Sequence, residues 1–326
     1  MAKLHTFKLN TGTLMPSVGM GCWRGQPGLG PDKELMRSLK LAIQAGYRHL
    51  DTASMYQNEA DIGQIIKESG VARSDFFLTT KLGLSMHDNV EKAIDESLDK
   101  LDTPYVDLYL MHWPQGRDSN GDAYGDGTGK GKGPTFQETW AAMEEKCFKT
   151  GKAKAIGVSN FSVQNLEKLL QTAKVVPAVN QVECHPYLPE LELEAYCREK
   201  GIHLTNYSPF GASHLPIHAD KDIVAIAAEK NVSPGQVALS WAVQHGHSAC
   251  PKSANEKRMK ENLELIKLSD VEMKRIDDIS KLDPTRRTRL NVLACDEKTG
   301  LVFGWTLKQL GWDIGFKTLG VPGIVE

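Results

Sequence analysis

The sequence has few features that would place the protein outside the cell or in a membrane. Its six cysteines are scattered, and no two are spaced as C-x-x-C. Such cysteines are typical of reduced, partly buried thiols rather than of a disulfide framework. Residues 1–5 lack the apolar stretch of a signal peptide, and no run approaches the roughly 20 apolar residues of a membrane span. We therefore predict a cytoplasmic protein without a membrane partner.

The sequence also lacks an excess of charge of either sign. Lys and Arg number 39 against 41 Asp and Glu, and no long basic run is present. This balance argues against nucleic acid as a partner. The 326 residues, 40% of them apolar, can bury a large core without a disulfide or a structural metal. A chain of this length suits one large barrel or two domains.

Two glycine patterns for phosphate binding are incomplete. Gly19 and Gly21 have the first spacing of G-x-G-x-x-G, but Arg24 occupies the third glycine position. Residues 121–133 are rich in glycine, yet no Gly-Lys pair there is followed by Ser or Thr at the spacing of a phosphate loop. These failures weigh against an open, doubly wound nucleotide-binding sheet.

The chain repeats one pattern, a short apolar strand followed by a helix with apolar residues at helical spacing. The expected strands are 17–23, 48–51, 76–81, 106–112, 153–160, 178–183, 203–207 and 248–252. The expected helices are 32–45, 58–69, 88–101, 134–149, 162–173, 189–200, 220–231 with 233–245, and 255–266. Such alternation indicates parallel strands with crossover helices, and eight units predict a (β/α)8 TIM barrel of α/β class.

Three further segments lie outside this repeat. Residues 7–16 predict an N-terminal β-hairpin with its turn at 10–12. The insert 113–133 predicts a flexible loop over the barrel mouth. The tail 284–326 predicts a loop over or beside the mouth, within a single domain 1–326. Its aromatic residues either fold over a pocket or pack on the outer helices, namely Phe303, Trp305, Trp312 and Phe316.

A carboxylate and a tyrosine lie close together in the stretch 46–63. Asp51 ends an expected strand, Tyr56 follows in a loop, and Asn58 can cap the next helix. Lys81 ends the next strand after an apolar run, so it needs a counter-charge, which Asp51 could supply. The charge of Lys81 would lower the pKa of Tyr56 from ~10. A tyrosine coupled in this way can exchange a proton near neutral pH.

Other polar or aromatic residues also end expected strands. In a parallel barrel these ends share one face, where catalytic loops lie. Each residue alone has an ordinary explanation, such as a helix cap or a surface charge, but the set favours a catalytic mouth. The residues are Trp23, Asp51, Lys81, His112, Ser159, Asn160, Gln181, Tyr207 and Lys252.

The sequence also contains residues that could form a metal site or an anion site. Glu183, Cys184 and His185 are adjacent, so on a strand they point to opposite faces, and no other spacing fits zinc. We therefore predict no metal. Lys252 and Arg258 flank an expected helix start, which is either an anion site or a solvated basic turn.

Several segments resemble the aldo-keto reductase family. Residues 46–53 (GYRHLDTA), 106–114 (VDLYLMHWP) and 251–253 (PKS) with Arg258 resemble its three signatures, and 157–161, 180–183 and 207–209 also match. The resemblance extends from the hairpin to about Asp283. It implies a (β/α)8 barrel that binds NADPH without a doubly wound nucleotide domain.

The resemblance also implies roles for individual residues. The implied catalytic tetrad is Asp51, Tyr56, Lys81 and His112. The residues implied to hold the nicotinamide are Ser159, Asn160 and Gln181, with Tyr207 stacking on its ring. Those implied to wrap the pyrophosphate are Ser208, Pro209, Phe210 and Gly211, where many relatives have Leu in place of Phe210. Those implied at the adenosine 2′-phosphate are Lys252, Ser253, Asn255 and Arg258, with Glu261 and Asn262 near the adenine. The implied substrate-pocket walls are Trp23 and Trp113.

The resemblance thus implies a monomeric NADPH-dependent oxidoreductase. Its substrate would be a small-molecule carbonyl, namely an aldehyde derived from a small sugar, a uronate or a polyol, with Tyr56 as proton donor. The alternative is a regulatory subunit of this fold that binds the cofactor and has little turnover. A barrel isomerase or hydrolase would need a metal set or another acid–base pair, which the sequence lacks. The insert 113–133 and the tail match relatives poorly, which leaves the substrate open.

Overall fold

Eight parallel strands form the centre of the molecule. The structure is a computed structural model, and it describes residues 5–25, 32–126, 131–211, 217–282 and 299–312. Their order in the sheet is β12–β11–β10–β9–β6–β5–β4–β3. The strands are β3 (Met20–Gly21), β4 (His49–Asp51), β5 (Phe77–Leu82), β6 (Leu108–Met111), β9 (Ile156–Ser159), β10 (Val179–Glu183), β11 (His203–Tyr207) and β12 (Ser248–Cys250).

Backbone hydrogen bonds join the two edges of this sheet. The amide of Gly19 donates to the carbonyl of Ala249 (2.9 Å), and the amide of Ala249 donates to the carbonyl of Ser17 (2.8 Å). The amide of Gly21 donates to the carbonyl of Pro251 (3.0 Å). The sheet is therefore a barrel without a free edge, and the predicted (β/α)8 fold is confirmed.

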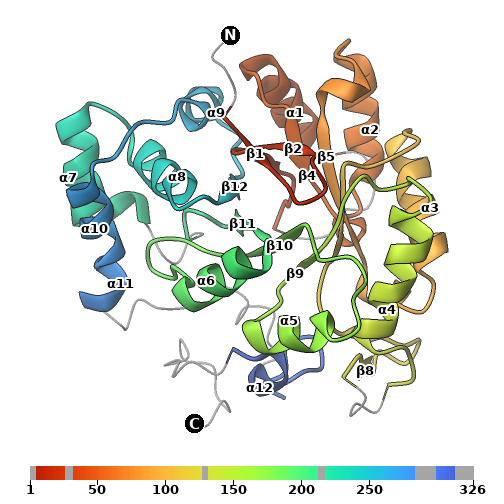
Figure 1. The fold of residues 1–326 in the computed structure, drawn as a ribbon. Helices are drawn as coiled ribbons and strands as arrows, with labels where there is room; N and C mark the ends of the chain where they lie inside the picture. Colours follow the sequence, from red (N-terminus) through yellow and green to blue (C-terminus); the bar gives the residue numbers. More distant parts are fainter. Residues whose placement is uncertain (1–4, 26–31, 127–130, 212–216, 283–298, 313–326) are drawn as a thin grey trace.

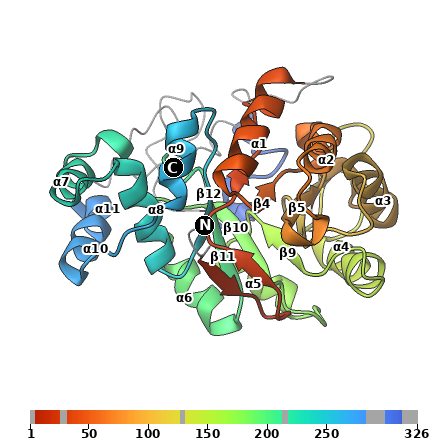
Figure 2. The ribbon, with the colours of Figure 1, turned by 90° about the horizontal axis from the view of Figure 1, so that it is seen from above.

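Helices surround the barrel (Figures 1 and 2). Those that the sequence predicted are α1 (Lys33–Ala45), α2 (Glu59–Glu68), α3 (Val90–Leu101), α4 (Phe136–Met143), α5 (Val163–Leu170), α6 (Leu191–Lys200), α7 (Lys221–Lys230), α8 (Pro234–Gln244) and α9 (Glu256–Leu263). Three more are α10 (Asp270–Asp277), α11 (Ile279–Leu282) and α12 (Leu307–Leu310). None of the helices in the described residues is long and apolar enough to cross a membrane.

Local sequence sets the ends of these helices. Asp32 caps α1 by accepting from two backbone amides, and Gly46 ends it with φ 111°. A positive φ of this kind suits glycine, which has no Cβ. Reciprocal capping bonds start α8, where Ser233 and Gln236 satisfy each other's backbone amides.

The N-terminal hairpin closes the end of the barrel where the strands begin. Strands β1 (Thr6–Lys8) and β2 (Leu14–Pro16) pair antiparallel, as predicted, and lie across the barrel in Figure 2. Leu9 and Met15 are buried in a cluster with Leu108 and Val179 inside the barrel. Because apolar side chains fill this end, the opposite end is left for a functional site.

The insert and the tail pack together at the end of β6. Within the insert, β7 (Gly116–Arg117) and β8 (Ala123–Tyr124) pair antiparallel. The ring of Trp113 lies 5.1 Å from that of Phe303 and 5.7 Å from that of Trp312, centroid to centroid. Trp305 instead packs against Phe136 of α4, with centroids 6.5 Å apart. The tail therefore contacts both the mouth and an outer helix. Residues 283–298 and 313–326, including Phe316, lie outside the described residues.

Candidate active site

A buried ion pair joins the ends of two neighbouring strands. Lys81 of β5 directs its Nζ to the two carboxylate oxygens of Asp51 on β4, at 2.9 and 3.0 Å, and to the carbonyl of Thr52 at 2.8 Å. Lys81 is 0% exposed and Asp51 is 4% exposed. Three acceptors around one ammonium offset the cost of removing it from water. Burial is the largest single influence and lowers the pKa of Lys81, but Asp51, Tyr56 and Cys250 together outweigh burial and the net pKa is raised.

Gln181 fixes the carboxylate of this pair from across the barrel. Its Nε2, on β10, donates to Oδ1 of Asp51 at 2.9 Å. Ser159 in turn donates through its hydroxyl to the carbonyl of Gln181 at 2.8 Å. Asp51 therefore has partners on both sides, which holds its carboxylate in one orientation under Lys81.

Tyr56 lies above this pair, in the short helical turn η1 (Ser54–Tyr56). The Nζ of Lys81 is 5.2 Å from the centre of the Tyr56 ring. That ring also packs against His112, with centroids 5.7 Å apart at 74°, and against Trp23, with centroids 4.9 Å apart. The structure therefore brings together the four residues of the predicted tetrad.

The predicted lowering of the Tyr56 pKa is wrong for this structure. Burial is the largest influence and raises the pKa of the phenol, and the net pKa is raised although the charge and the hydrogen bond of Lys81 lower it. Asp51 also raises the pKa, because it offsets the charge of Lys81. Tyr56 therefore keeps its proton at neutral pH, as a proton donor must.

His112 is a neutral imidazole beside Tyr56. Burial lowers its pKa well below the ordinary value, and the nearby Lys81 acts in the same direction. Its Nδ1 is buried and has no hydrogen-bond partner among the described residues. A neutral imidazole has one donor and one acceptor nitrogen, so it can orient a carbonyl without adding charge.

Asn160 connects three strand ends around the site. Its Nδ2 donates to the carbonyl of His112 at 2.9 Å, and its Oδ1 accepts from the hydroxyl of Tyr207 at 2.8 Å. The backbone of Asn160 is left-handed, with φ 64°, a conformation that asparagine tolerates better than most residues. Ser159, Asn160, Gln181 and Tyr207, which the sequence predicted to hold a nicotinamide, thus form one connected group with the tetrad.

The segments predicted to bind the rest of the cofactor lie next to each other. After β11, the amide of Gly211 donates to the carbonyl of Ser208 (2.9 Å), which makes a tight turn that contains Pro209 and Phe210. A Cβ added to Gly235 would lie 3.6 Å from the Phe210 ring and 3.7 Å from Oδ1 of Asn262. The turn, the start of α8 and α9 therefore lie within contact distance of one another around Gly235.

The start of α9 presents two exposed cations. Asn255 caps the helix by accepting from the amide of Arg258 at 3.0 Å, and the amide of Asn255 donates to the hydroxyl of Ser253 at 3.2 Å. Lys252 and Arg258 are exposed, and neither forms an ion pair within the described residues. Glu261, half-buried, follows one turn later. Two free cations at a helix N-terminus fit a phosphate group.

The model of the Aldo/keto reductase family matches residues 17–281. The chain belongs to the aldo/keto reductase family. Glycerol 2-dehydrogenase (NADP(+)) of Saccharomyces cerevisiae is 43% identical to it over 286 residues, 84% of this chain and 90% of that protein. Aldehyde reductase YPR1 of the same yeast is 42% identical over 295 residues, 86% and 93% of the two chains. D-galacturonate reductase of Hypocrea jecorina is 40% identical over 291 residues, 84% and 90% of the two chains.

Solved structures of aldo/keto reductases have the same fold. The aldose reductase of Schistosoma japonicum is 31% identical with a TM-score of 0.78, over 89% of this chain and 95% of that one. An aldo-keto reductase of Bombyx mori, solved in complex with NADP, is 33% identical with a TM-score of 0.77, over 85% and 93% of the two chains. The family predicted from the sequence is confirmed.

In this aldo/keto reductase, Asn58 has a role that the sequence interpretation missed. It occupies the N-cap position of α2, but its side chain makes no capping bond, so the predicted cap is wrong. Instead it accepts from the Thr52 hydroxyl at 2.6 Å and donates to the carbonyl of Cys22 at 2.8 Å. These bonds tie the loop that carries Tyr56 to the end of β3. The sequence gives no signal for them, because they depend on Asn58 being buried.

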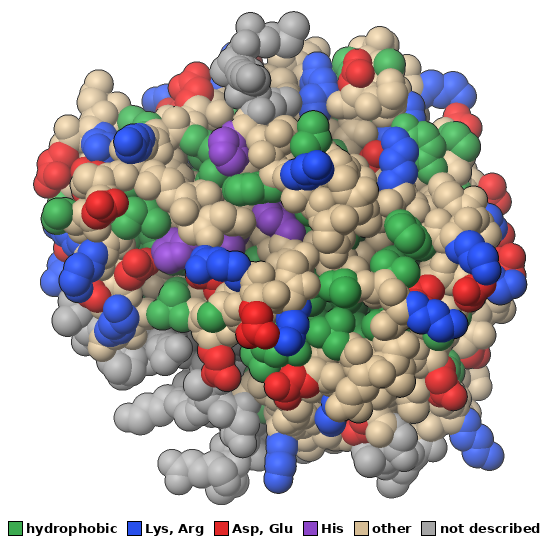
Figure 3. Space-filling view, in the orientation of Figure 1, with side chains coloured by type: hydrophobic (Ala, Val, Ile, Leu, Met, Phe, Trp, Pro, Cys, Tyr) green, Lys and Arg blue, Asp and Glu red, His purple; other side chains and the backbone are tan. Residues whose placement is uncertain are grey.

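The two predicted pocket walls differ in exposure. Trp23 is 40% exposed and packs on Tyr56, whereas Trp113 is 5% exposed and is covered by Phe303 and Trp312. Figure 3 shows acidic and basic side chains interspersed over one face of the reductase, without a patch of a single sign. Because of this difference in exposure, Trp23 is the predicted wall that remains accessible, whereas Trp113 is covered by the tail.

Proposed function

We propose that this protein reduces an aldehyde to an alcohol with NADPH, and that Tyr56 donates the proton. The relatives support the reaction and the cofactor, since one is a glycerol 2-dehydrogenase (NADP(+)), one an aldehyde reductase, and one was solved with NADP. The observation that carries the role of Tyr56 is the fully buried ammonium of Lys81, 5.2 Å from the Tyr56 ring and fixed by Asp51.

The residues that would hold the cofactor form a continuous group. Ser159, Asn160, Gln181 and Tyr207 would hold the nicotinamide beside Tyr56, and the turn 208–211 would enclose the pyrophosphate. Lys252 and Arg258 would bind the 2′-phosphate, with Ser253 and Asn255 beside it and Glu261 and Asn262 near the adenine. Bound NADPH supplies the hydride.

The tetrad then acts on the carbonyl oxygen. His112 orients this oxygen through its imidazole, and Tyr56 gives its proton to the oxygen as negative charge develops there. The phenolate that remains is stabilised by the ammonium of Lys81, which Asp51 and the carbonyl of Thr52 hold in place. Because the raised pKa keeps Tyr56 protonated at neutral pH, the donor is ready when substrate binds.

Tyr56→Phe tests the proton donor. This variant keeps the ring that packs between Trp23 and His112, so NADPH binding should be unchanged in a fluorescence titration. Turnover should fall by at least the ~10²–10⁴ that acid–base catalysis contributes. Tyr196→Phe, on the half-buried ring of an outer helix, is the matched control and should keep full turnover. Near-normal turnover of Tyr56→Phe would remove Tyr56 from the acid role.

We further propose a small sugar, uronate or polyol-derived aldehyde as substrate, and a monomer of one domain in the cytoplasm. The galacturonate reductase and glycerol dehydrogenase among the relatives support this substrate class. A steady-state NADPH oxidation assay should detect turnover of glyceraldehyde, pentoses or uronates, and gel filtration should give one chain. Tight NADPH binding without turnover of any of these would favour the regulatory subunit instead.

A further inference from the structure

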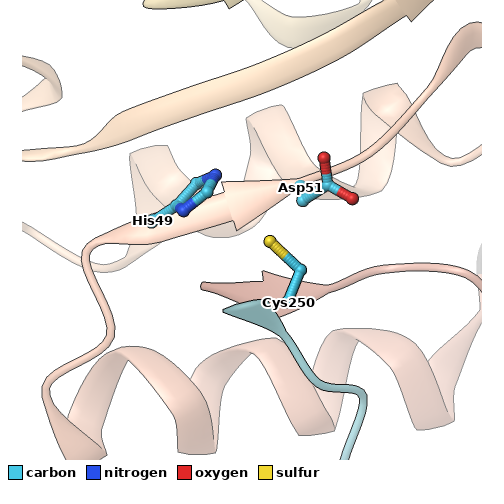
Figure 4. Close-up of side chains that lie close together, drawn as sticks. All are labelled: His49, Asp51 and Cys250. Carbon is cyan, nitrogen blue, oxygen red and sulfur yellow. The ribbon is translucent and has the colours of Figure 1, made fainter. Parts of the chain in front are cut away.

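Three potential metal ligands meet inside the barrel below the ion pair. His49 and Asp51 lie on β4, and Cys250 lies on β12. Each offers one ligand atom, all three atoms lie within 4.8 Å of one another, and all three residues are buried. Figure 4 shows the sulfur of Cys250 pointing toward the strand that carries His49 and Asp51. Of these residues, the proposed reaction uses only Asp51.

The strand between them explains why they meet. β3 separates β4 from β12 in the barrel, and two glycines face inward there, Gly19 just before β3 and Gly21 within it. A Cβ on Gly19 would lie 2.5 Å from Nδ1 of His49, and one on Gly21 would lie 2.8 Å from the carbonyl oxygen of Cys250. No side chain of ordinary size fits at either position. The groups on β4 and β12 therefore approach each other across a strand without side chains there.

One ring nitrogen of His49 faces Gly19. Its Nε2 lies 3.1 Å from the Thr79 hydroxyl, whereas its Nδ1, which faces Gly19, is buried and has no hydrogen-bond partner among the described residues. The residue is 0% exposed. The carbonyl of Pro16 also interacts with the ring, so zinc bound to His49 would compete with that contact.

We propose that His49, Asp51 and Cys250 form a site for Zn²⁺ and that zinc bound there inhibits the reductase. Imidazole, carboxylate and thiolate are the ligands that zinc prefers. Bond lengths of about 2.0–2.3 Å require ligand atoms roughly 3.3–3.8 Å apart. The three ligand atoms, within 4.8 Å of one another, must therefore move closer by up to about 1.5 Å when zinc binds. The thiol proton passes to solvent as the zinc–sulfur bond forms, and no electron is transferred.

Inhibition follows from the double use of Asp51. The same carboxylate holds Lys81 through two contacts. Zinc bound to Asp51 would weaken that ion pair and place a second cation near the ammonium, so Tyr56 would lose its organised neighbour. Asp51 and Cys250 end β4 and β12 at the barrel mouth, which is the side from which zinc would enter. The inhibition rests on the proposed function, whereas zinc binding does not.

Zinc binding can be measured on the metal-free protein without NADPH or substrate. Competition with a chromophoric chelator should show one Zn²⁺ per chain, and Co²⁺ should give a thiolate charge-transfer band. Cys250→Ala should lose both signals and weaken zinc by more than the roughly 10–100-fold cost of an outer-shell change. Cys22→Ala is the matched control, because Cys22 is buried at the same barrel end but directs its sulfur to the carbonyl of Met20.

The outcomes separate the two proposals. Absence of stoichiometric zinc in the wild type, or equal weakening by Cys250→Ala and Cys22→Ala, would overturn the site. Absence of the cobalt–thiolate band would overturn it without any variant. Zinc that binds but leaves NADPH oxidation unchanged would overturn the inhibition. A wild-type protein that binds zinc yet reduces no aldehyde would instead count against the proposed function alone.

Discussion

Ion pairs lie at both ends of the barrel, fully buried at one end and partly buried at the other. At the mouth, the Lys81 ammonium is paired with one carboxylate, Asp51, and lies beside Tyr56. At the opposite end, the His245 imidazole lies between two carboxylates, 2.9 Å from Asp277 and 3.3 Å from Glu194. The first cluster joins two barrel strands, whereas the second joins α6, α8 and α10.

The difference lies in what surrounds each cation. Burial alone lowers the pKa of His245, but its two carboxylates outweigh burial and raise the pKa to about 9. The charged imidazole is therefore held between two ionised acids and has no proton to transfer to them. Lys81 has one acid and a phenol as neighbours, and its charge acts on the phenol. Similar ion pairs therefore serve stability at one end and proton transfer at the other.

Replacing Lys81 should have the largest effect, because it removes the buried cation at the mouth. Lys81→Met leaves Asp51 buried without its counter-charge, which should cost about 3–5 kcal/mol of stability and abolish turnover. Urea unfolding and steady-state NADPH oxidation measure the two losses. The double variant Asp51→Asn with Lys81→Met should regain much of the stability but none of the turnover. A double variant as unstable as the single one would contradict the pairing.

Arg258 adds an exposed cation to the comparison. Arg258→Ala should weaken NADPH binding by about 10–100-fold, the worth of a charged hydrogen bond, and leave NADH binding unchanged. Fluorescence titration with both cofactors measures this. Lys260→Ala, an exposed cation of the same helix that pairs with Glu256, should change neither affinity. Equal losses for NADPH and NADH in Arg258→Ala would show that Arg258 does not bind the 2′-phosphate.

The smallest effect should come from His245. His245→Gln should leave turnover unchanged and lower the melting temperature by a few degrees. The size of this decrease should depend on pH. The folded-state pKa of about 9 exceeds the ordinary value of 6.5, so the stabilisation is complete below pH 6.5 and is lost as pH rises through 9. Melting curves at pH 6 and pH 10 should therefore differ between wild type and variant only at pH 6. A similar gap at both values would contradict an electrostatic role.

The repeated pattern of strand and helix predicted the barrel because each element has its own periodicity. The Asp51–Lys81 pair was also predictable, since a lysine after an apolar run needs an acid nearby. α10 was missed although Ser269 and Glu272 form a capping box at its start, a signal that the sequence contains. Short elements such as β7 and β8 depend on contacts with the tail and have little periodicity of their own.

Other properties of the site depend on packing that no local pattern records. The pKa of Tyr56 was mispredicted because burial is the largest influence on it. That burial is set by residues far away in the sequence, such as Trp23. The meeting of His49 with Cys250 required the strand order and the glycines at positions 19 and 21. Ligand spacing along the sequence can therefore exclude only metal sites whose ligands lie close together in the sequence.

The bonds between the insert and the tail have a consequence for changes in specificity. Gln115 donates to the carbonyl of Val302 at 2.9 Å, and Gln309 donates to the Asp126 carboxylate at 2.8 Å. Replacing either segment alone with that of a relative would leave the first pair buried without a partner and break the second, partly buried bond. Evolution and protein engineering must therefore exchange both segments together, so that new pockets arise as matched pairs of loops.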